Sequence, residues 1–313
     1  MNNLRKIGLS ALAGSLATFS VNAADVSVSG GASISFDDTN RGKADRGNGF
    51  YMGDSLKFNM SGETDGGLGV AVYYEIDGGA LDDHNIKLSG DWGSLTFDGH
   101  GGSSEFGAVD DKTPNAYEEA FDGLGTSAVV INGHSAKDMF HYTSESFSGA
   151  VLTASFVPAE ATTSTGNKST YMDFGVTYTP DMVEGLTLGY AMGTTEVTAG
   201  SEVDESTMYA TYAIGGLTVG YQLSDYDASA ATDSDDSVAI GISYQVNDDI
   251  SVSYNEHTVD IGDSSTDQES EGISASYTMG GITIAGHSNE MKAVGGTSGT
   301  NDEGYEINLS FAF

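Results

Sequence analysis

The last nine residues of the chain, YEINLSFAF (residues 305–313), decide the fold. Their odd-numbered positions are apolar, and their even-numbered positions are polar or small. Successive side chains of a β-strand point to opposite faces, so this stretch predicts a strand with one apolar and one polar face. The same alternation recurs over residues 172–178, 217–223 and 238–246, which indicates an all-β protein.

Composition excludes several classes of function. The 313 residues carry a net charge of −35, from 46 acidic and 11 basic side chains, which argues against binding a nucleic-acid backbone. The absence of cysteine excludes a disulfide framework, a thiolate nucleophile and a cysteine-ligated metal. Sixteen tyrosines and 13 phenylalanines argue against a disordered chain, which lacks aromatic residues.

Residues 1–23 have the pattern of a secretory signal peptide. Arg5 and Lys6 precede the short apolar stretch Ile7–Phe19, and Val21-Asn22-Ala23 fits the small-x-Ala cleavage site. The apolar stretch is too short to span a bilayer comfortably as a helix, and no other apolar run approaches that length. We therefore expect residues 24–313 to form one domain that is either secreted or inserted into a membrane as strands.

The polar face of the strands favours a membrane barrel over a soluble sandwich. It consists mainly of Ser, Thr, Gly, Asn and Ala, which suits a wet interior. The segments run about nine to eleven residues, the length of a tilted membrane-spanning strand. We predict about 16 strands, which begin near Val26, Asp54, Leu68, Asn85, Ser94, Asp138, Ala150, Thr170, Gly185, Ser206, Leu217, Ser237, Asp249, Ser270, Gly281 and Glu303.

The connectors between these strands alternate in length. Short turns such as Asp65-Gly66-Gly67 alternate with longer loops, including Asp77–His84 and His100–Lys137. Short turns on one side and long loops on the other are typical of a transmembrane antiparallel β-barrel. Closure of the barrel removes both sheet edges, whose free backbone groups hydrocarbon cannot satisfy.

The third long connector, residues 100–137, is too long for a plain turn. Lys112 is its only basic residue before Lys137. Its carboxylates are the candidate pore-lining acids: Glu105, Asp110, Asp111, Glu118, Glu119 and Asp122.

Three segments carry a family resemblance. KFNMSGET (57–64), GSLTF (93–97) and YTSESFSG (142–149) occur in the order and spacing of a second strand, a fifth strand and a sixth strand with its turn. With them, the chain from Asp25 to Phe313 resembles the general porins of Gram-negative outer membranes, in particular their alphaproteobacterial branch. The terminal aromatic Phe313 resembles the signal that barrel-insertion machinery reads.

The resemblance implies a channel whose third loop folds inward and narrows the pore. Its carboxylates would face basic residues on the barrel wall, here Lys57 and Lys87, and the position where relatives often have Arg is Thr143, with His141 two residues earlier. It also implies a homotrimer in outer-membrane lipid that passes ions and small hydrophilic solutes by passive diffusion. Because acid dominates the loop and the wall has few bases, we predict a preference for cations.

No motif indicates catalysis or a bound cofactor. The six histidines lack zinc-ligand spacing, and neither a nucleophile elbow nor a dinucleotide fingerprint occurs, so we expect no enzyme and no metal. Acidic outer loops such as Asp82-Asp83 could bind Ca²⁺, although none has EF-hand spacing. Two other interpretations stay open: a substrate-selective channel of the same fold, and a secreted acidic β-rich adhesin or surface-layer protein.

Overall fold

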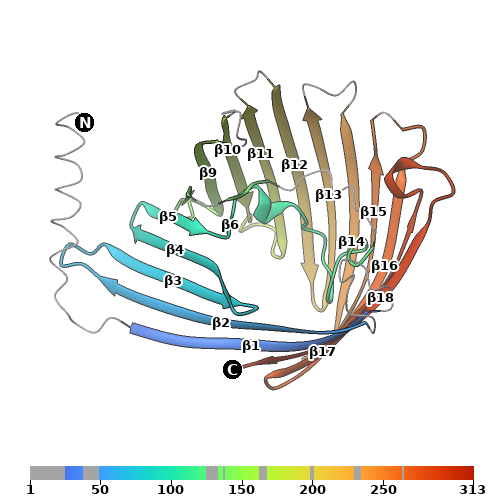
Figure 1. The fold of residues 1–313 in the computed structure, drawn as a ribbon, viewed down its shortest axis with the longest axis horizontal. Helices are drawn as coiled ribbons and strands as arrows, with labels where there is room; N and C mark the ends of the chain where they lie inside the picture. The colour runs from blue at the N-terminus through green and yellow to red at the C-terminus, as the bar shows by residue number, and fades with distance from the viewer. Residues whose placement is uncertain are drawn as a thin grey trace.

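The strands of the chain close into one antiparallel barrel (Figure 1). The computed structural model describes residues 25–37, 49–124, 133–136, 138–161, 168–197, 201–228, 234–262 and 264–313, so the signal-peptide prediction lies outside it. Within these residues, sixteen strands pair with their chain neighbours, and β1 pairs with β18, which confirms the predicted fold class. The barrel strands are β1 (Asp25–Asp37), β2 (Phe50–Glu63), β3 (Gly69–Asp77), β4 (Ala80–Gly90), β5 (Gly93–His100), β8 (Met139–Thr143), β9 (Ala150–Ala161), β10 (Lys168–Tyr178), β11 (Leu186–Val197), β12 (Ser201–Ile214), β13 (Leu217–Ala228), β14 (Asp235–Asn247), β15 (Ile250–Asp260), β16 (Gln268–Met279), β17 (Ile282–Lys292) and β18 (Asp302–Ala312).

The two ends of the described chain meet at the seam of the barrel. Leu309 of β18 pairs with Ile34 of β1. Beyond β18, the backbone N–H of Phe313 donates to the carbonyl of Gly30 at 3.0 Å, and the N–H of Gly30 donates to the carbonyl of Phe313 at 2.8 Å. The terminal residue therefore lies in the barrel seam, joined to the first strand.

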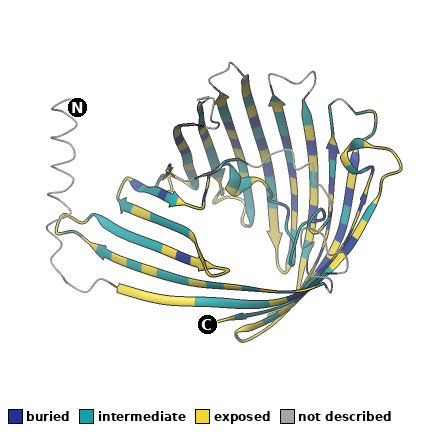
Figure 2. Cartoon of the chain, in the orientation of Figure 1, coloured by how far each residue is buried: buried dark blue, intermediate teal, exposed yellow. Residues whose placement is uncertain are grey.

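Burial is inverted relative to a soluble protein. Large apolar side chains on the outer face are exposed, for example 50% for Ile34 and 53% for Phe174, whereas the buried residues are mainly Ser, Thr, Asn, Gln and Asp. Exposed and buried residues alternate along the strands in Figure 2, as the period of two requires. An apolar outside and a polar inside are the pattern of a barrel that faces lipid and encloses water.

One predicted loop and several strand lengths are wrong. The expected long connector Asp77–His84 is a two-residue turn, because Asp77 pairs with Ala80 across Gly78-Gly79. Both glycines have positive φ (57° and 80°), the conformation that a tight hairpin turn needs, and the polar residues after them belong to β4. β2 and β12 run to 14 residues, and β8 has only five.

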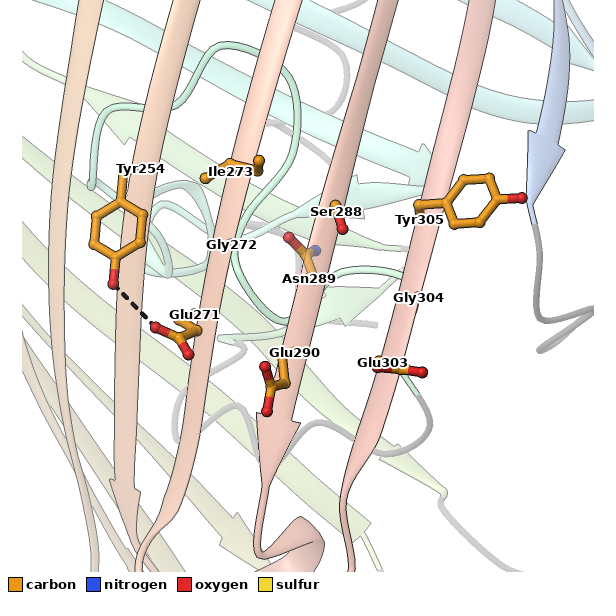
Figure 3. Close-up of a pocket in the computed structure, with 10 residues that line it drawn as sticks. All are labelled: Tyr254, Glu271, Gly272, Ile273, Ser288, Asn289, Glu290, Glu303, Gly304 and Tyr305. Atoms are coloured by element: carbon orange, nitrogen blue, oxygen red, sulfur yellow. Dashed lines mark hydrogen bonds between the residues drawn. The ribbon is translucent and has the colours of Figure 1, made fainter.

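A row of glutamates interrupts the outer apolar face near the long-loop ends of the last strands. Glu256 of β15 pairs with Glu271 of β16, Glu271 with Glu290 of β17, and Glu290 with Glu303 of β18. Figure 3 shows three of them in a hollow with Tyr254, which donates a hydrogen bond to Glu271 at 3.1 Å. Like charges directly opposite one another are destabilising. Lys292 of β17 offsets part of this repulsion, because its ammonium lies 3.3 Å from Glu271 and 3.9 Å from Glu290.

Candidate functional site

The described residues of the third loop (101–124, 133–136 and 138), called L3 below, lie inside the barrel between β5 and β8. Figure 1 shows its described part, with β6 (Gly102–Ser103) and the short 3-10 helix η1 (Gly107–Val109), crossing the interior. β6 pairs with β7 (Ser135–Ala136), which joins the two ends of the loop. The hydroxyl of Ser104 accepts the backbone N–H groups of Gly107 and His134, both at 3.0 Å, and fixes the loop base.

A buried carboxylate holds the first part of L3 to the wall. Asp173 of β10 is 0% exposed and accepts the N–H of Phe106 at 2.9 Å and the N–H of Ser155 at 2.6 Å. The Tyr171 hydroxyl donates to the same carboxylate at 3.1 Å. Three donors compensate the burial of one charge, so Asp173 is a fixed anchor rather than a group available to solutes.

Side chains of later strands hold the middle and far parts of L3. Gln222 of β13 accepts the N–H of Lys112 at 2.6 Å and donates to the carbonyl of Val109 at 2.8 Å. The N–H of Ala116 donates to the Ser253 hydroxyl of β15 at 3.0 Å. L3 therefore follows the inner wall from β9 towards β18 instead of extending into solvent.

The structure separates the predicted acidic residues into two groups, one in the first part of the loop (Glu105, Asp110 and Asp111) and one at its far end. Glu105 lies at the loop base, where the Thr143 hydroxyl donates to it at 3.2 Å and His141 Nδ1 lies 3.9 Å from its Oε1. Burial raises the pKa of Glu105, and the neighbouring His141 and Thr143 partly offset that rise. The predicted wall residues His141 and Thr143 thus contact the loop, and His141 also bonds to Asp98 of β5.

Asp110 and Asp111 serve the local turn. Asp110 accepts the N–H of Asp111 at 2.8 Å, and burial raises the pKa of its carboxyl. Asp111 accepts both the N–H and the hydroxyl of Thr113, at 3.0 and 2.8 Å. These bonds orient the segment that enters the far half of the loop.

Glu118, Glu119 and Asp122 form the second group, at the far end of L3. Burial, followed by the nearby carboxylates of Asp122 and Glu306, raises the pKa of Glu118 to about 7. Burial, with the Asp111 carboxylate adding to it, raises the pKa of Glu119 to about 8. Glu118 and Glu119 therefore titrate near neutral pH, because burial and, after it, the neighbouring carboxylates disfavour their charged forms.

The basic side of the site is thin. Lys57 of β2 forms an ion pair with Glu75 of β3 at 3.4 Å, so its charge is locally compensated. Lys87 of β4 is exposed, and its charge opposes the burial-driven rise in the pKa of Glu105. On β3, which lies between them, Lys57 is opposite Glu75 and Lys87 is opposite Ala71, so the two lysines are offset along the wall.

Sequence reasoning missed the wall residues that hold L3, among them Asp173, Gln222 and Glu306. Glu306 accepts a hydrogen bond from the Tyr117 hydroxyl at 3.0 Å. All three occupy the alternating polar positions of their strands. That pattern does not single them out, because every strand residue that faces water shares it.

One group of carboxylates in the described residues has the spacing of a cation site. Oxygens of Glu75, Asp82 and Asp83 lie within 4.8 Å of one another. Glu75 already accepts a hydrogen bond from the Ser55 hydroxyl at 2.5 Å and forms an ion pair with Lys57.

Among the described residues, no helix is long and apolar enough to cross a bilayer.

Comparison with known proteins agrees with this geometry. A search of curated proteins found no match. Among solved structures, an anion-selective porin from Comamonas acidovorans is 16% identical, with 93% of this chain and 100% of that chain covered and a TM-score of 0.69. The trimer form of OmpT from Vibrio cholerae is 11% identical over 93% and 100%, with a TM-score of 0.65. A Rh. blastica porin mutant is 17% identical over 92% and 100%, with a TM-score of 0.59.

The sequence match is more specific than these structural similarities, which at such identities show the fold alone. The family described as Gram-negative porin matches residues 8–286. Because this match spans most of the chain and the closed barrel has the porin fold, the chain is an outer-membrane β-barrel of the Gram-negative porin family.

Proposed function

We propose that the protein is a water-filled channel for passive diffusion of ions and small hydrophilic solutes, and that it prefers cations. The observation that supports this most is the course of L3, a carboxylate-bearing loop bound along the polar inner wall of a closed barrel. A loop in that position narrows the lumen and places its charge beside the solute path.

The cation preference rests on the balance of charges around L3. Glu118, Glu119 and Asp122 lie at its far end, whereas Lys57 of β2 is paired with Glu75. The Comamonas acidovorans porin is described as anion-selective, so the fold alone does not determine the sign of selectivity. The side chains that line the channel decide it.

We also propose a homotrimer embedded in outer-membrane lipid. The exposed apolar outer face would bury part of its area between subunits, and the trimer form of the Vibrio cholerae protein supports this arrangement by similarity of fold. A cleaved signal peptide over residues 1–23 and recognition of Phe313 by insertion machinery complete the proposal. Absence of an enzymatic activity and of a cofactor, and calcium in the acidic outer loops, stay predictions.

Purified protein in planar bilayers tests the channel and its selectivity together. We expect stepwise insertions, with three conductance units per step for a trimer, and zero-current potentials in a KCl gradient that favour potassium. Absence of steps would overturn the channel, and anion-favouring potentials would overturn the cation preference. A solute that blocks the current at low concentration would instead support a substrate-selective channel.

A further inference from the structure

A row of glycines and asparagines crosses the inner wall beneath L3. Each residue is the register partner of the next on adjacent strands β13 to β17. The row is Gly220, Gly241, Asn255, Gly272 and Asn289. Both asparagines are only 4% exposed, although they face the interior of a channel. Something therefore covers this row, and that cover is L3.

The asparagines bind the backbone of L3 at two places. The Asn255 amide donates to the carbonyl of Pro114 at 3.1 Å. The Asn289 amide donates to the carbonyls of Glu119 at 2.8 Å and Asp122 at 2.9 Å. The two bonds from Asn289 go to the main-chain oxygens of residues that themselves carry loop carboxylates, so they fix where those carboxylates lie.

The glycines allow the loop to approach the wall closely. A Cβ at Gly220 would overlap Pro114 Cδ, and its three nearest atoms all belong to L3. A Cβ at Gly241 would lie 2.8 Å from Thr113 Cβ and 2.5 Å from Asn255 Nδ2, and one at Gly272 would overlap Asn289 Oδ1 and lie 3.0 Å from the Cα of Ala120. None of the three has positive φ, so L3 and the two asparagines that bind it, and not backbone conformation, require glycine here. Glycine weakens a strand interior and often marks such a close backbone approach.

We propose that this glycine–asparagine row determines the size of solute that the channel admits. The glycines set the distance between L3 and the wall, and the asparagines hold the loop at that distance. Because the loop occupies the lumen, its distance from the wall sets the width left open on its other side. This proposal rests on the proposed channel function and names the residues that set its size limit.

Substitution of the glycines by alanine tests the proposal, because it should make the channel narrower. Gly220→Ala and Gly241→Ala each place a methyl group against L3 and push it into the lumen, so we expect single-channel conductance to fall by about a third and the cutoff for neutral polyethylene glycols to decrease. Gly53→Ala is the matched control: it also faces the lumen in a strand, but the one atom within 4 Å of the added Cβ is the Ser33 hydroxyl of β1, and no described atom of L3 lies that close. Unchanged or larger conductance in both alanine variants, relative to Gly53→Ala, would overturn the proposal.

Asn289→Leu should change the size cutoff in the opposite direction. It keeps a similar side-chain volume and removes both donors to L3, so we expect a larger cutoff and noisier open-channel current. A merely structural role would lower the heat stability of both classes of variant without moving the cutoff in opposite directions. If the natural protein forms no channels, the proposed function fails; if it forms channels and the cutoffs do not diverge, only the role of the row fails.

Discussion

The Tyr117 hydroxyl donates to Glu306 Oε1 at 3.0 Å, which joins the far end of L3 to the last strand of the barrel. This bond connects residues 189 positions apart in the chain.

Tyr117→Phe removes the donor and leaves the ring, which stacks on His287. We expect a loss of about 1 kcal/mol in loop anchoring, with more frequent current fluctuations. Noise spectra of single channels measure it, and spectra identical to those of the natural protein would show that the bond does not restrain L3.

Cation preference should rise with pH across the neutral range. Glu118 and Glu119 have pKa values of about 7 and 8, so both are largely neutral at pH 6 and ionised at pH 9. We expect the potassium-to-chloride permeability ratio to increase about twofold to threefold over that interval. The double variant Glu118→Gln, Glu119→Gln should flatten the curve. A slope that persists in this variant would show that Glu118 and Glu119 do not control the pH dependence.

The same carboxyls affect stability in the opposite direction. Their folded pKa values lie above the ordinary value, so between about pH 4.5 and pH 8 the folded protein retains protons that the unfolded chain has lost. Stability from these groups therefore falls as pH rises through that window. Unfolding in denaturant at pH 5 and pH 8.5 measures this, and the double glutamine variant should show a smaller difference between the two.

Release of the Lys57 charge should shift selectivity towards anions. Glu75→Gln keeps an acceptor for the Ser55 hydroxyl but removes the partner charge of Lys57. We expect the permeability ratio to fall by about half. Glu303→Gln changes the net charge by the same amount on the outer face and should leave the ratio unchanged. Equal shifts in the two variants would mean that overall charge, and not the lumen side chain, controls selectivity.

Asp173→Ala should detach the base of L3. It leaves the buried N–H groups of Phe106 and Ser155 without their acceptor, at a cost of about 2–4 kcal/mol. We expect unfolding on detergent gels at lower temperature and faster proteolysis within residues 100–124. Asp204→Ala is the control, because that carboxylate is exposed and accepts only the Thr194 hydroxyl among the bonds described. If the two variants behave alike, Asp173 does not anchor the loop.

The barrel could be predicted from local pattern, because alternation depends on neighbouring residues. The error at Asp77–His84 arose where Asp82, Asp83 and His84 resemble a loop, although Gly78-Gly79 completes the turn alone. The course of L3 could not be predicted in the same way. Its anchors lie 67 to 189 positions away, at Asp173, Gln222 and Glu306, and only the folded wall aligns them. A polar residue that faces water and one that holds the loop both occupy the alternating polar positions of a strand, so the sequence does not distinguish them.

The seam between Gly30 and Phe313 has a consequence for the order of assembly. The first strand acquires its second neighbour only when β18 pairs with it. Until then, two strand edges with free backbone groups remain open, and these edges promote aggregation. The barrel therefore cannot close before the strand farthest from β1 along the chain is available, and loss of β18 would leave both edges open.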